Sequence, residues 1–207
     1  MHLLDTRQYR SDQVCGPLDP GERSCEALDD PTLSLTGAAQ ERWLLNELKG
    51  SKAPFNVVAS QTWFAPYRYN DLTDVSYVNM DQWDGYPIQR QRLIDALADV
   101  SNPVVLSGDW HAAAAMRIHK NPWDPKSPRI GHNFCGTSIS SHCPWWEAIR
   151  AARDFNGHVD HLNGGQRGYL RCDVTERNWS SEYRVVADPR DPKSAVTTDV
   201  TIDTRDT

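Results

Sequence analysis

Short apolar runs along the first half of the chain alternate with segments whose apolar residues recur at helical spacing. The runs at 2–5, 55–61 and 102–111 are rich in apolar and β-branched residues, which predicts β-strands. The last run has a continuous apolar centre, Pro103 to Leu106, and ends in Gly108-Asp109, as expected for a central strand that is buried on both faces. With a helix between successive strands, this order is typical of a layered α/β domain.

The two predicted helices cover residues 37–48 and 87–99. Thr36 is placed to cap the first helix, and Pro87 is well suited to the first position of the second. In each segment the apolar residues fall on one helical face, which we expect to pack on the sheet. The inward-facing positions are Trp43, Leu44, Leu48, Ile88, Leu93, Ile94 and Leu97.

The second half of the chain changes character after a proline-containing connection at 121–128. Four later segments alternate in the manner of strands and predict a mostly antiparallel sheet that closes the domain. They are residues 130–135, 167–175, 182–187 and 195–203. Two long loops interrupt the first half: residues 11–36, rich in Asp, Pro, Gly and Ser, and the aromatic and acidic residues 62–86.

Charge and composition narrow the class of partner. The chain has 207 residues and a formal net charge of −6, which argues against sequence-independent nucleic-acid binding because that requires a basic surface. No window approaches the ~18 consecutive apolar residues of a membrane span. The first residues lack the basic and apolar regions of a signal peptide, so we expect no export signal within this chain. Its oligomeric state is left open.

The five cysteines lie in two short loop-like segments and one strand-like run. Cys15 and Cys25 flank CGPLDPGERSC, and Cys135 and Cys143 bracket CGTSISSHC. We expect a disulfide in each segment and a free, buried thiol at Cys172, a pattern that indicates an oxidising compartment. A zinc ribbon is the weaker alternative, because the chain contains no Cys-x-x-Cys pair.

The clearest candidate chemistry follows the third strand. Asp109 and His111 stand two residues apart directly after Val-Val-Leu-Ser-Gly, and residues i and i+2 of an extended chain point to the same side. In α/β sheets, functional groups gather beyond the carboxyl ends of the strands. A carboxylate and an imidazole there suit a hard or borderline metal ion, so both residues are candidate metal ligands. The competing interpretation is a turn-capping Asp beside an unrelated surface His.

Other polar residues are assigned structural roles. Asp5 also ends a strand, where an ion pair with Arg7 or Arg10 is the simpler account. The remaining histidines show no paired spacing at strand ends and are expected to be surface or loop residues. They are His119, His132, His142, His158 and His161.

Several blocks occur in an order that resembles the alkaline phosphatase D family of calcineurin-like metallophosphoesterases. They cover most of the chain, with 114–130 and 142–165 looser. The blocks are LDTRQYRSDQ at 4–13, QERWLLNEL at 40–48, DQWDGYPIQRQRLIDAL at 81–97, VVLSGDWHAA at 104–113, FCGTSISS at 134–141 and QRGYLRCDVT at 166–175.

This resemblance implies a layered α/β/β/α sandwich and the hydrolysis of small-molecule phosphate mono- or diesters by a binuclear centre of iron and calcium, Fe³⁺ and Ca²⁺. On the matching positions Asp109 would bind calcium and His111 iron. The loop around Trp83 and Tyr86 is a candidate substrate wall or lid, with a packed surface loop as its equal alternative. Arg167 could contact a substrate phosphate, although a structural salt bridge is the preferred interpretation. Family members are exported, so the full-length protein is expected to be secreted or in the cell envelope.

The resemblance also implies that part of the family pattern is missing. The family's earlier ligands, a Cys and an Asp, Tyr and Asn, do not match Asp5, Arg7, Tyr9 or Cys15, for which a structural role is expected. We therefore interpret residues 1–207 as the C-terminal part of a single metallophosphatase domain, incomplete at its N-terminus and with a partial metal site. The alternatives are a catalytically inert fragment or binding module of the same fold, and another phosphoesterase of the superfamily.

Overall fold

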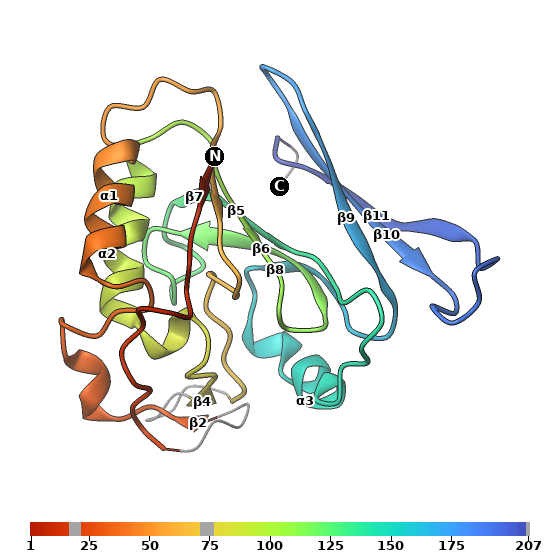
Figure 1. Cartoon of the computed structure of the whole chain (residues 1–207), viewed down its shortest axis with the longest axis horizontal. Coiled ribbons are helices and arrows are strands. Elements are labelled where there is room, and N and C mark those ends of the chain that lie inside the picture. Colours follow the sequence, from red (N-terminus) through yellow and green to blue (C-terminus); the bar gives the residue numbers. More distant parts are fainter. Residues whose placement is uncertain (17–21, 71–76, 206–207) are drawn as a thin grey trace.

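The computed structural model describes residues 1–16, 22–70 and 77–205. Its centre is a six-stranded sheet, whose strands can be followed in Figure 1. Four neighbouring strands are parallel, and β6 runs antiparallel to both of its neighbours. The spatial order is β1 (His2–Leu3), β3 (Asn56–Ala59), β5 (Pro103–Ser107), β7 (Arg129–Cys135), β6 (Ala113–His119) and β8 (Val159–Asn163). The predicted strand–helix alternation is thus confirmed for the first three strands.

Helices α1 (Ala38–Leu48) and α2 (Pro87–Ala98) cover one face of this sheet (Figure 1). Their buried leucines and Ile94 form one apolar cluster with Val58 and Val105 of the central strands. Each such side chain contributes roughly 1.5–3 kcal/mol when it leaves water. This packing fixes β5, and with it the turn that follows β5.

Two details of the helices differ from the prediction. Gly37, with φ of 75°, occupies the N-cap of α1, and Thr36 is buried, where its hydroxyl accepts a hydrogen bond from Gln89. Trp43 is not buried as expected: it is 43% exposed and makes an edge-to-face contact with the ring of His2 at the edge strand β1. Thr36 therefore joins α1 to α2 and does not cap α1.

A second, three-stranded antiparallel sheet covers the opposite face and confirms the closing sheet expected for residues 167–203. Its strands are β9 (Arg167–Val174), β10 (Trp179–Val186) and β11 (Val196–Asp203). Trp179 and Tyr183 of β10 pack on Val104 and Phe134, and the Tyr183 hydroxyl donates to the Ala114 carbonyl. Residues 130–135 belong instead to the first sheet as β7, and β6 was not predicted.

Short elements complete the described part. They are β2 (Glu22–Arg23), paired with β4 (Tyr77–Val78), and η1 (Glu26–Asp29), η2 (Trp83–Gly85), α3 (Trp146–Ala151) and η3 (Arg153–Phe155). None of the helices in the described ranges is both long enough and apolar enough to span a bilayer.

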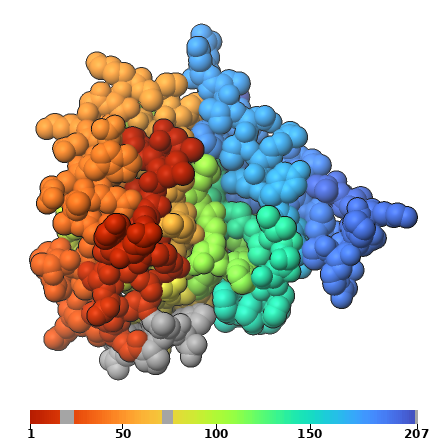
Figure 2. Space-filling view, in the orientation of Figure 1, coloured from red at the N-terminus to blue at the C-terminus, as the bar shows by residue number. Residues whose placement is uncertain are grey.

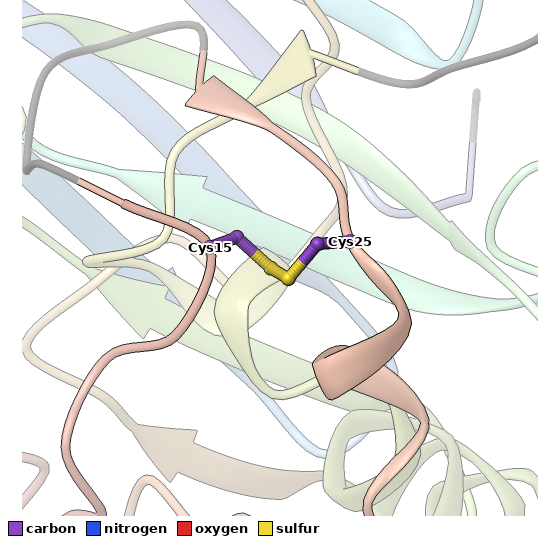
Figure 3. Close-up of a disulfide and its surroundings, with 2 residues drawn as sticks. All are labelled: Cys15 and Cys25. Carbon is purple, nitrogen blue, oxygen red and sulfur yellow. A yellow bond between two sulfur atoms is a disulfide. The ribbon is translucent and has the colours of Figure 1, made fainter.

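One of the two expected disulfides is present. Cys15 and Cys25 are joined, with their Cα atoms 5.5 Å apart (Figure 3). The prediction for Cys135 and Cys143 is wrong, because both are free, buried thiols that point to different backbone carbonyls. Burial raises the pKa of Cys135 to about 12. Cys172 is free as predicted, and it lies half-buried in β9.

Gly168 of β9 has no room for a side chain. A Cβ atom placed there would lie 1.8 Å from the carbonyl oxygen of Arg184 on β10. We expect Gly168→Ala to lower the free energy of unfolding by about 1–3 kcal/mol, since the two strands must separate to admit the methyl group. Urea unfolding checks this, with Gly157→Ala as the control because a methyl group on Gly157 would meet no atom within 4 Å. Equal losses in the two variants would contradict the steric account.

Candidate functional site

The turn after β5 carries both candidate ligands. Asp109 and His111 have φ angles of 70° and 58°, in the left-handed region that non-glycine residues rarely adopt. The backbone therefore bends sharply here, and the amide of Trp110 bonds to the carbonyl of Gly108 at 2.9 Å. The expected extended geometry is wrong at this point. What aims the two side chains is a strained turn at the carboxyl edge of the sheet, and such strain persists only where surrounding contacts hold it.

The segment from Cys135 to Trp145 supplies those contacts. Four of its side chains donate hydrogen bonds to backbone carbonyls of the turn, at distances from 3.2 to 3.7 Å. The donors are Cys135, Thr137, Cys143 and Trp145, and the acceptors are the carbonyls of Gly108, Trp110 and His111. The turn is thus bound on one side by the last residue of the neighbouring strand β7 and by residues that follow it.

The His111 ring is oriented by two contacts. Its Nδ1 lies 2.9 Å from the carbonyl oxygen of His142, and the ring stacks on Trp145 with centroids 5.6 Å apart. A carbonyl can only accept, so Nδ1 is the donor in this contact, and Nε2 is the ring nitrogen left for a metal ion. This is the arrangement that outer-shell carbonyls impose on metal-binding histidines, so His111 fits the role of a ligand.

Asp109 is held from the opposite side. Its side chain is 43% exposed, and its Oδ2 accepts a hydrogen bond of 2.8 Å from Arg7. Arg7 also binds both carboxylate oxygens of Asp81, at 2.8 and 2.9 Å. Partial burial alone would raise the pKa of Asp81, but hydrogen bonds from Arg7 and Arg10 lower it below its ordinary value. Figure 2 shows the N-terminal segment, in red, on the same face as the green centre of the chain.

The arginine contacts correct one prediction. Asp5 forms no ion pair with Arg7 or Arg10 among the described residues. Its carboxylate instead accepts the backbone amides of Arg7 and Gln8, both at 2.9 Å. Sequence reasoning missed the bridge from Arg7 to Asp109 because 102 positions separate the two residues. The arginine-containing block at 4–13 was the only signal that could have pointed to it.

The candidate substrate residues lie elsewhere. Trp83 and Tyr86 are each 1% exposed in the core under the helices, so they cannot form a substrate wall. The part of their loop at 71–76 lies outside the described residues. Arg167 is buried and donates to the carbonyls of Ser141 and Gly164, with no salt bridge in the described ranges. Backbone carbonyls thus take the place of the preferred salt bridge, and contact of Arg167 with a substrate phosphate stays a prediction.

The histidines also depart from expectation. His119, His132 and His158 are each at most 6% exposed. His161 in β8 lies 3.2 Å from Asp199 of β11. His142 alone among these candidates is exposed, as predicted.

Asp109 and His111 offer donor atoms that a metal ion could use: a carboxylate oxygen and an imidazole nitrogen. They form a partial set. Across the described ranges, no group of three or more His, Cys, Asp or Glu side chains is arranged to hold a metal ion.

Comparison with known proteins defines the class. A family model described as PhoD-like phosphatase matches residues 1–183, and the chain belongs to this family. Its sequence is 38% identical over 203 residues to alkaline phosphatase D of Bacillus subtilis (strain 168), a match that covers 95% of the chain and 34% of that protein. A solved structure described as "Structure of PhoD" is 33% identical with a TM-score of 0.83, over 97% of this chain and 39% of that one. The chain thus spans about a third of the length of its curated relative.

Proposed function

We propose that this chain supplies part of the active site of a metal-dependent hydrolase of phosphate mono- or diesters. The observation that carries the proposal is the turn after β5, which presents Asp109 and His111 at the carboxyl edge of the sheet. The family membership supports the same activity. A small phosphoester is the expected substrate, and the net charge of −6 argues against nucleic acid as a partner.

In this proposal, Asp109 binds Ca²⁺ through the carboxylate oxygen that Arg7 leaves open, and His111 binds Fe³⁺ through Nε2. Bound there, the cations would neutralise charge on the phosphate and lower the pKa of a coordinated water. The chain's own residues keep the donors in place: Arg7 holds Asp109, and Trp145 supports the His111 ring.

We infer that the chain by itself hydrolyses phosphoesters weakly or not at all. Two ions about 3.5–4 Å apart need more ligands than one carboxylate and one imidazole. The helix layer and the two sheets would then form part of a larger α/β/β/α sandwich. The relatives are longer chains, and their additional residues would complete such a sandwich. The Cys15–Cys25 disulfide supports export of the full-length protein to an oxidising compartment.

An inert fragment or binding module of the same fold is the second candidate. It is favoured by the lack of a three-ligand group within the described part of the chain and by the ion pair that already neutralises Asp109. Metal content distinguishes the partial active site from the inert module, because the inert module is expected to bind no metal ion at Asp109 and His111.

The proposal is tested on purified chain with Asp109→Ala and His111→Ala. In equilibrium dialysis against iron and calcium salts, we expect the metal bound by the wild type to fall to background in both variants. His142→Ala is the matched control, because its backbone carbonyl, and not its ring, contacts His111. We expect wild-type hydrolysis of p-nitrophenyl phosphate to be barely above background. Unchanged metal content in the two alanine variants would refute the assignment, and vigorous hydrolysis by the wild type would refute the partial site.

A further inference from the structure

The guanidinium of Arg7 lies between two carboxylates that come from distant parts of the chain. Arg7 follows β1, Asp81 precedes η2 and Asp109 follows β5. One Arg7 nitrogen is 2.8 Å from Asp81, and the other is 2.9 Å from Asp81 and 2.8 Å from Asp109. A planar guanidinium that is bound at two points has a fixed direction for its remaining donors.

Asp81 is itself anchored. Besides Arg7, its Oδ1 accepts hydrogen bonds from Arg10 at 2.5 Å and from Gln13 at 2.7 Å. Its side chain is only 29% exposed. The two arginines balance the charges of Asp81 and Asp109, so the cluster is electrically neutral and stays compact at the protein surface.

Asp109, in contrast, stands on an exposed turn. Within the described ranges, its carboxylate accepts a side-chain hydrogen bond from Arg7, and that bond occupies Oδ2. No hydrogen bond to Oδ1 is found within those ranges, so this oxygen is available to a cation. An aspartate without such a partner would rotate about its side-chain bonds and lose a defined direction, at an entropic cost to any ligand that binds it.

We propose that Arg7 is the positioning residue for Asp109: fixed on Asp81, it sets the direction in which the Asp109 carboxylate faces a cation. That this orientation serves cation binding rests on the proposed function. The rival account is that Arg7 is only a competing positive charge, whose removal would strengthen cation binding at Asp109. The two accounts predict opposite signs for the same substitution.

The first experiment measures side-chain order without any metal. Three-bond NMR couplings to Cγ of Asp109 should report a single rotamer in the wild type and averaged rotamers in Arg7→Gln. Amide spectra verify that the fold is intact. Arg150→Gln is the control, because Arg150 forms a similar but exposed pair with Glu147. A single Asp109 rotamer in Arg7→Gln would overturn the proposal. Arg7→Lys keeps the positive charge but lacks the planar, two-pronged guanidinium. If Arg7→Gln unfolds, Arg7→Lys replaces it in the measurement and should show partly averaged Asp109 rotamers.

The second experiment uses Tb³⁺, a hard cation whose emission is sensitised by nearby tryptophans such as Trp110. We expect Arg7→Gln and Arg7→Lys to bind Tb³⁺ about 10-fold more weakly than the wild type, the usual cost of losing an outer-shell contact. Tighter binding by Arg7→Gln would establish the competing-charge account and overturn ours. Equal binding by the wild type and Asp109→Asn would instead refute Asp109 as a ligand, and the rotamer measurement would still decide whether Arg7 orients it.

Discussion

Lowering the pH from 7 toward 4 is expected to destabilise this fold by several kcal/mol, because His132 and His158 are buried as neutral rings. Burial lowers the pKa of each from 6.5 to about 4. Neighbouring arginines add to the effect, Arg129 and Arg117 beside His132, and Arg117 and Arg90 beside His158. Protonating either ring in place would leave a cation in the interior, and no carboxylate within the described ranges forms an ion pair with it.

The direction of the pH effect on the free energy of unfolding follows from the protonation of the two histidines in the folded and the unfolded chain. Above pH 6.5 both rings are neutral in the folded and unfolded chain, and their contribution to stability is complete. Between pH 6.5 and 4 only the unfolded chain binds the protons, so the free energy of unfolding falls as the pH falls. The interval from 6.5 to about 4 corresponds to roughly 3 kcal/mol per histidine.

Urea unfolding measured at steps from about pH 7.5 to 4.5 checks this. His132→Gln and His158→Gln should each reduce the pH dependence, whatever their effect on stability at pH 7. His142→Gln, at an exposed position, is the control for the effect of a His→Gln substitution itself. A free energy of unfolding that stays level from pH 7 to 5 would contradict the prediction.

The second large effect concerns the buried ion pair of Asp84 and Arg90. Their side chains are 3% and 1% exposed, and the other Asp84 oxygen accepts the backbone amide of Tyr67 at 2.9 Å. The guanidinium also lies over the Trp123 ring, 5.5 Å from its centre. Asp84→Asn leaves the Arg90 charge buried without its counterion, so we expect a loss of about 3–5 kcal/mol.

Denaturant unfolding of Asp84→Asn, Arg90→Met and the double variant measures this coupling. The double variant should lose less than the sum of the two single variants, because neither charge is then buried alone. Glu147→Gln removes an exposed ion pair with Arg150 and should cost less than about 1 kcal/mol. The prediction fails if Asp84→Asn unfolds within about 1 kcal/mol of the wild type.

Local patterns in the sequence were sufficient for much of the architecture. The apolar run before Gly108 located a central strand and the edge where Asp109 lies, because a strand buried on both faces has an unambiguous composition. Pro87 began α2 as expected. The Cys15–Cys25 pair was predictable because a short polar loop between two cysteines has no competing place in a core.

Features that depend on tertiary packing were not predictable. Cys135 and Cys143 lie close in sequence, but Cys135 ends a buried strand and its thiol is used by the turn after β5. Trp83 and Tyr86 occupy a loop-like stretch, yet α1 and α2 enclose them. Strand β6 was missed because its alanines carry no β-branched signal, and it is a strand only because β7 and β8 pair with it.

The left-handed backbone at Asp109 and His111 has an evolutionary consequence. Glycine adopts this conformation freely, so replacing either residue with glycine would relieve strain in the turn. Selection of variants for heat resistance alone would therefore favour glycine at both positions. The selected variants would be more thermostable but would lack the two side chains on which the proposed chemistry depends. Thermal stability and catalysis therefore select for different residues in this turn.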